Sequence, residues 1–179
     1  MALWLGETII SFEEILLRFG LASLFGLLLG LDREVRGISA GVRTHMLVAL
    51  SSAVTMLFAL ELFEELSVRG ESDPDPTRAI QGLAQAIGFL CAGVIFVARG
   101  SVRGLTTAAS LWMTSAIGMA AGAGQYKIAL AAILYAVAIV SVMWLVMRKK
   151  PVPGTALPEE ADRKQGSGHP APSHRADGA

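Results

Sequence analysis

Long apolar runs alternate with short clusters of charge along this chain of 179 residues. The runs are roughly 17–21 residues long, the length of helix that crosses the hydrocarbon core of a bilayer. In the whole chain 53% of residues are hydrophobic and 17% are charged, a low charge content for a soluble domain. A soluble bundle would need a polar face on each helix, and the run 129–147 has almost none. The sequence therefore predicts an all-α polytopic membrane protein, a bundle of about five transmembrane helices.

The expected spans lie at 12–31, 44–60, 79–97, 105–121 and 128–147. The stretch 61–78 is acidic and contains Pro74 and Pro76, which is typical of a solvated loop. After the last span, Pro, Gly, Ser and mixed charge dominate without an apolar period. We therefore expect one transmembrane domain over residues 1–150 and a disordered tail over 151–179.

The placement of lysine and arginine predicts the orientation in the membrane. Most basic residues fall on one side of the expected spans: Arg33, Arg36, Arg43, Arg99, Arg103, Arg148, Lys149 and Lys150. The other side carries Arg69, Arg78 and Lys127. The positive-inside rule places the richer side in the cytoplasm. The N-terminus is then expected outside, and the tail is expected in the cytoplasm.

Composition argues against several classes of function. The formal net charge is zero, so no bulk electrostatic attraction to nucleic acid is expected. Cys91 is the only cysteine, which excludes an internal disulfide and a cysteine metal site and makes it a small packing residue. No Ser/His/Asp or Cys/His set and no phosphate-loop motif appears. We therefore expect no enzyme activity and predict no catalytic, cofactor-binding or metal-binding residue.

Hydroxyl side chains mark one face of the expected span 105–121. Thr107, Ser110 and Thr114 are spaced three and four apart, so they share a helix face. Such a face is expected to bond to a neighbouring helix or to line a wet cleft rather than to contact lipid. The alternative is that these hydroxyls bond back to carbonyls of their own helix.

Two charged segments are predicted to share the cytoplasmic side, the loop 32–45 and the stretch 99–107. Asp32 and Glu34 could then meet Arg43 or Arg103 and hold three helices in register. The functional alternative is a site for a cation, a proton or a partner. A hard cation would want several oxygen ligands, and two carboxylates with two threonines beside arginines are a thin set.

Two blocks of the sequence stand out, GLDRE at 30–34 with AGVRTHMLVAL at 40–50, and GFLCAGVIF at 88–96 with SVRGLTTAASLW at 101–112. They resemble the MgtC/SapB family of bacterial inner-membrane proteins. The resemblance extends over about Phe12 to Met147, and the second block is long and unusual. Within the blocks we single out a functional motif: Asp32, Arg33, Glu34, Arg43, Thr44, His45, Arg103, Thr106 and Thr107.

The resemblance implies a multi-helix inner-membrane protein linked to growth under magnesium limitation and to survival inside host phagocytes. It also implies that ATP synthase is a candidate partner, restrained by some family members. An acidic residue is held to matter in the family's first loop, and Asp32 occupies that position. Many members carry a C-terminal domain of ACT-like type, for which the region after Pro151 is too short and too polar. Position 91 is cysteine where the family motif usually shows glycine.

Two hypotheses about function remain open. The first is a regulatory protein that contacts another membrane complex, favoured by the resemblance and by the small-residue steps Gly26/Gly30 and Gly118/Gly122. The second is a transporter of magnesium or another ion, favoured by the hydroxyls of span 105–121 with Gln81 and Gln85. The near absence of ionisable residues from the membrane centre argues against transport. Assembly of several copies of the chain is left open.

Overall fold

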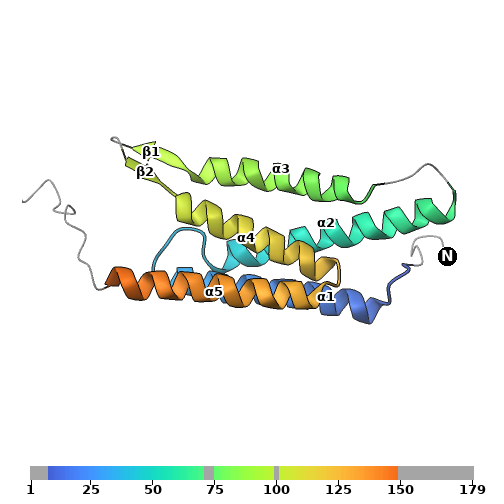
Figure 1. The fold of residues 1–179 in the computed structure, drawn as a ribbon, viewed down its shortest axis with the longest axis horizontal. Helices are drawn as coiled ribbons and strands as arrows, with labels where there is room; N and C mark the ends of the chain where they lie inside the picture. The colour runs from blue at the N-terminus through green and yellow to red at the C-terminus, as the bar shows by residue number, and fades with distance from the viewer. Residues whose placement is uncertain (1–7, 71–74, 99–100, 149–179) are drawn as a thin grey trace, which may run out of the picture. The chain divides into compact units, whose positions relative to one another are not determined.

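The computed structural model describes residues 8–70, 75–98 and 101–148. These residues form five helices and one two-stranded sheet (Figure 1). The elements are α1 (Phe12–Val35), α2 (Val42–Val68), α3 (Thr77–Val94), β1 (Phe96–Ala98), β2 (Ser101–Arg103), α4 (Leu105–Gly122) and α5 (Tyr126–Arg148). The chain divides into two compact units, Met1–Ser141 and Val142–Ala179, and the contacts below lie in the first. The tail predicted at 151–179 lies outside the described residues.

Two of the described helices, α1 and α2, are long and apolar enough to cross a membrane. The apolar part of α5, Tyr126–Val142, is shorter. The all-α membrane bundle is therefore confirmed, with two clear candidate spans among the described residues. A total of five spans stays a prediction.

Two helices run further than the sequence predicted. α1 includes Asp32 and Glu34, which were expected in a loop, and it ends only where Gly37 takes a φ of +64°. The Gly37 and Ile38 N–H groups donate to the carbonyls of Glu34 and Arg33, a glycine-type helix end.

At the other boundary, α2 extends through residues 61–68, where a solvated loop was predicted. Glutamates and leucines in this stretch are good helix formers, and the Glu65–Arg69 pair adds support at spacing four. The acidic composition therefore marked an exposed helix face rather than a loop.

The strands were not predicted at all. α3 ends at Val94, whereas the span was expected to continue to 97. β1 then pairs antiparallel with β2, with Val97 opposite Val102. A run of β-branched and aromatic residues favours strand over helix here. Gly104 has a φ of +88°, and a Cβ added there would lie 3.0 Å from the Val94 carbonyl carbon. The hairpin thus brings the start of α4 back to the end of α3 (Figure 1).

Small residues bring the backbones of α1, α2 and α4 together. A Cβ at Gly26 would lie 2.6 Å from the His45 carbonyl oxygen, and one at Gly30 would lie 2.5 Å from the Val42 Cα. Because the α1 number rises as the α2 number falls, these two helices are antiparallel.

The second small-residue step joins α4 to α2. Cβ atoms at Gly118 and Gly122 would lie 2.9 Å and 2.7 Å from the Cα atoms of Ala49 and Ala53. Both numbers rise together, so α4 runs parallel to α2. The C-terminal end of α1 and the N-terminal ends of α2 and α4 therefore meet at one end of the bundle, which we call the Arg33 end.

Apolar side chains fill the spaces beside these backbone contacts. One cluster includes Phe25, Leu29, Ile117 and Ile133 from α1, α4 and α5. A second cluster, from α2, α3 and α4, includes Cys91, whose thiol lies 3.2 Å from the Ala108 carbonyl oxygen. The prediction that Cys91 is a packing residue is confirmed.

Candidate functional site

Arg33 lies in the last turn of α1 and is 2% exposed. Its Nη2 donates to the Thr107 hydroxyl of α4 at 2.5 Å and to the Ser39 carbonyl at 3.3 Å. Its Nε is buried and has no hydrogen-bond partner within the described part of the chain. In that part Arg33 also has no carboxylate within ion-pair distance. A buried cation is thus held by neutral oxygens, which is an uncommon arrangement because desolvation of a charge is costly.

His45, in the first turns of α2, is fully buried beside this arginine. Its Nδ1 lies 3.0 Å from the Gly41 carbonyl oxygen and its Nε2 lies 3.3 Å from the Ser110 hydroxyl. The Ser110 hydroxyl donates to the Thr107 carbonyl at 2.8 Å. Arg33, Thr107, Ser110 and His45 therefore form one polar chain that crosses from α1 through α4 to α2.

The hydroxyl face of α4 combines two of the bonding patterns that the sequence left open. Thr107 and Ser110 contact neighbouring helices, as just described. Thr114 instead donates back to the Ser110 carbonyl at 2.7 Å. Further along, Ser115 lies 2.8 Å from Ser52 of α2, both fully buried. The face is therefore a contact surface between helices, with some hydroxyls bonded within α4.

The two acidic motif residues have partners other than those predicted. Asp32 forms an ion pair with Arg36, one helical turn later. Glu34 accepts the Val42 backbone N–H at 2.7 Å, which caps the N-terminus of α2. The predicted pairing with Arg43 or Arg103 is wrong. The reason is that α1 continues past Asp32, which places Arg36 at the favourable spacing of four.

The remaining motif residues differ in exposure. Arg43, Arg103 and Thr106 are exposed, and Thr44 is half-buried. The structure thus joins Arg33, His45 and Thr107 directly and leaves the others around them at the same end. Gln81 and Gln85 are exposed on α3 and do not join this chain.

Sequence reasoning missed two participants, Arg36 and Ser39, and it placed Ser110 on the hydroxyl face without including it in the functional motif. Arg36 could have been found from its spacing of four residues after Asp32. Ser39 contributes a backbone carbonyl, which no residue pattern indicates.

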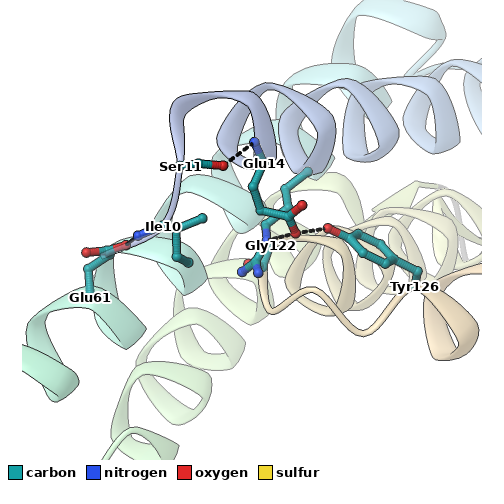
Figure 2. A network of polar contacts seen from close by, with 7 residues as sticks. Ile10, Ser11, Glu14, Glu61, Gly122 and Tyr126 are labelled. Atoms are coloured by element: carbon teal, nitrogen blue, oxygen red, sulfur yellow. Dashed lines mark hydrogen bonds and ion pairs between the residues drawn. The ribbon is translucent and has the colours of Figure 1, made fainter. Parts of the chain in front are cut away.

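A second polar network lies at the opposite end of the bundle, which we call the Glu14 end. Arg18 pairs with Glu14, four residues earlier, at 2.9 Å and donates to the Gly122 carbonyl at 2.9 Å. The Tyr126 hydroxyl also donates to Glu14, as Figure 2 shows. Glu61 accepts the backbone N–H groups of Ile9 and Ile10 at 2.9 Å and 3.0 Å. This network fastens α1 to α2 and to the junction of α4 with α5.

Asp75, before α3, lies outside the candidate membrane spans. The Thr77 hydroxyl and backbone N–H donate to its carboxylate at 2.6 Å and 2.9 Å. The hydrogen bond from the Thr77 hydroxyl is the main cause that lowers the pKa of Asp75 below its ordinary value. Among the described residues, no group of three or more His, Cys, Asp or Glu side chains is arranged to hold a metal ion.

The fold and its polar ends define a helical membrane protein with a buried arginine–hydroxyl chain. The sequence profile of the MgtC family matches residues 19–149, which includes the whole Arg33 end but begins after Glu14 and Arg18 of the Glu14 end. The chain belongs to the MgtC family.

Individual relatives agree with this assignment. YhiD of Escherichia coli K12, whose name provisionally calls it a magnesium transporter, is 36% identical over 64% of this chain and 54% of its own length. SapB of Bacillus subtilis is 34% identical over 76% of this chain and 59% of its own length. MgtC of Brucella abortus is 38% identical over 66% and 46%. The chain thus spans about half the length of these relatives. No solved structure matches.

Proposed function

We propose that this protein is a membrane regulator that serves adaptation to low magnesium by contacting another membrane complex, with ATP synthase as the candidate partner. The resemblance to the MgtC/SapB family supports the magnesium link and the choice of partner. The resemblance also supports the inner membrane as the location, and the positive-inside rule supports a cytoplasmic Arg33 end.

The observation that carries the contact hypothesis is an exposed stripe on α2. α2 is the central helix, because it packs against α1, α3 and α4. It nevertheless leaves Arg43, Leu47, Val54 and Phe58 exposed, and Leu47 and Phe58 are each more than 60% exposed. Successive residues of this set are four or seven apart, so they share one helix face. Such an apolar face can pack against a helix of a partner protein, and the arginine at its end can pair with an acidic group of the partner and so fix the position of that helix along the membrane normal.

A transporter of magnesium or another ion is the second candidate. The name of YhiD supports it. One structural feature also favours it, because Asp32 keeps one buried carboxylate oxygen, Oδ2, without a hydrogen-bond partner in the described part of the chain. The polar chain from Arg33 to His45 argues against it, because its groups are bonded to one another across the helix contacts where a pathway would run.

Affinity co-purification tests the contact. Membranes from cells grown in low magnesium would supply wild type, Arg43→Glu and the control Arg78→Glu, an exposed arginine on α3. We expect subunits of one membrane complex to be enriched with wild type and with the control, and lost with Arg43→Glu at equal membrane levels. Equal recovery from all three would refute the contact through α2.

A flux assay tests the alternative. Purified wild type and Asp32→Asn would be reconstituted in liposomes that contain a fluorescent magnesium indicator. Magnesium entry above the rate of empty liposomes, reduced by Asp32→Asn, would favour transport over regulation.

A further inference from the structure

The Arg33 end concentrates positive charge. Its described residues include the arginines Arg33, Arg36, Arg43 and Arg103, against the carboxylates Asp32 and Glu34. Both carboxylates are engaged, Asp32 by Arg36 and Glu34 by the first N–H of α2. The N-termini of α2 and α4 point to this end and each adds the partial positive charge of a helix start, whereas the C-terminus of α1 adds one partial negative charge. The field at this end therefore favours an anion.

The N-terminus of α4 lacks a side-chain cap of the kind that α1 and α2 have. α1 is capped by the Ser11 hydroxyl and α2 by the Glu34 carboxylate. The N-cap residue of α4 is Gly104, which has no side chain to accept a hydrogen bond. In the described part of the chain, the first-turn N–H groups of Leu105, Thr106 and Thr107 have no acceptor. Free N–H groups at the start of a helix of 18 residues form a natural anion cradle.

The buried guanidinium of Arg33 is directed at the same turn. Its bond to the Thr107 hydroxyl places a buried charge directly against the first turn of α4, and no carboxylate of the described residues lies within ion-pair distance of it. The Arg33 Nε–H has no hydrogen-bond acceptor in the described part of the chain, and the residue is only 2% exposed. On the outer side of the turn, Arg103 and Thr106 are exposed and add a second cation and a hydroxyl. Two independent features, an uncapped helix and a buried unpaired cation, thus meet at Thr107.

We propose that the N-terminus of α4 binds a phosphate group, either the headgroup of an anionic phospholipid or free phosphate. The first-turn N–H groups, the Thr106 hydroxyl and Arg103 contact the phosphate oxygens, and Arg33 supplies the counter-charge from below through Thr107. Phosphate suits this site because it offers several acceptor oxygens with more charge than a carboxylate, and arginine binds it strongly. The adjoining hairpin exposes the apolar side chains of Phe96, Val97 and Val102, which can contact the acyl chains of a lipid whose headgroup occupies the site.

Lipid and phosphate binding to the purified full-length protein tests the site. Thermal unfolding in dodecyl maltoside would be followed while phosphatidylglycerol or inorganic phosphate is added, because a ligand of the folded state raises the midpoint. We expect Arg103→Gln to weaken the response about tenfold or more, as loss of a charge-assisted bond does. The control Arg69→Gln, an exposed arginine at the Glu14 end, should respond as wild type does.

The outcomes distinguish the two sources of phosphate. A response to phosphatidylglycerol alone assigns the site to a lipid headgroup, and a response to inorganic phosphate assigns it to the free anion. Arg33→Gln should also lose the response, but Arg103→Gln decides if that variant does not fold. No response to either ligand, or equal responses of wild type and Arg103→Gln, overturns the proposal. The partner test uses Arg43, so the two proposals fail separately.

Discussion

Each end of the bundle contains a largely buried arginine, and the two arginines differ in the charge of their hydrogen-bond partners. At the Glu14 end, Arg18 is paired with a carboxylate and with the last carbonyl of α4. At the Arg33 end, Arg33 is more deeply buried but bonds to a hydroxyl and a carbonyl. At the Glu14 end the protein's own carboxylate pairs with the arginine, so this network serves to hold helices together. At the Arg33 end the arginine has no carboxylate in an ion pair among the described residues, and this difference points to the Arg33 end as the place where an anionic ligand would bind.

The largest effect is expected from a substitution of Gly104, the N-cap residue of α4 at the Arg33 end. Gly104→Leu should abolish accumulation in the membrane, because the residue has a φ of +88° and its Cβ would collide with the Val94 carbonyl. Gly124, at the Glu14 end, also has a positive φ, but its Cβ would meet the flexible end of Arg18. Gly124→Leu should therefore accumulate better, as immunoblots of membranes would measure. Equal levels of the two variants would contradict this reading.

Function should also depend unequally on acidic residues of the two ends. We expect Asp32→Ala to reduce growth in low magnesium to nearly that of a strain lacking the gene. Glu64→Ala, on an exposed face of α2, should stay close to wild type. Growth curves at equal membrane levels of the variants would measure this. Equal defects would mean that the Asp32 carboxylate has no special role.

A direct comparison of the two arginines sharpens the contrast in stability. Arg18→Met leaves Glu14 without its cation and should lower the unfolding midpoint in detergent by several degrees. Arg33→Met removes a desolvated charge that has no carboxylate within ion-pair distance among the described residues. When no anion is added, this variant should therefore lower the unfolding midpoint clearly less than Arg18→Met does. Thermal unfolding of both variants beside wild type tests this. A larger loss for Arg33→Met would show that its hydroxyl contact alone is a major source of stability.

The smallest effect concerns Asp75, an exposed carboxylate before α3. Its pKa is lowered by the Thr77 hydroxyl, so the cap contributes stability above the ordinary pKa of about 3.9 and is lost as pH falls through the lowered value. A carbon-13 NMR titration in detergent should give a midpoint below about 3.9. Thr77→Ala should move it upward. An unchanged midpoint in that variant would assign the shift to the Thr77 backbone N–H.

The sequence predicted the helical framework because apolar length and small-residue spacing are local signals. The steps Gly26/Gly30 and Gly118/Gly122 are at the helix contacts, and the segments around Arg33 and Thr107 meet at one end as the basic residues indicated. The predicted partners of Asp32 and Glu34 were wrong, because the partners of these carboxylates depend on where α1 ends. That end is set by a positive φ at Gly37, and the prediction stopped at the first charged residue.

The β1–β2 hairpin and the extension of α2 could not be predicted from the sequence for a different reason. Residues 95–97 are as apolar as the helix before them, so hydropathy alone could not separate strand from helix. The acidic residues after Leu60 resembled a solvated loop, yet their helix propensity was favourable. The contact of Arg33 with the Ser39 carbonyl is a backbone interaction, and side-chain identity cannot indicate it.

The paired glycine–alanine contacts of α2 and α4 limit how this protein can move. Gly118 and Gly122 are four residues apart and face Ala49 and Ala53, also four apart. A slide of α4 along α2 would drive larger side chains into the α2 backbone, and even a shift by a full turn would bring Thr114 into the place of Gly118. Small displacements must therefore take the form of a pivot about these contacts. An event at one end of the bundle would then reach the other end as a change of tilt, in the manner of a lever rather than a piston.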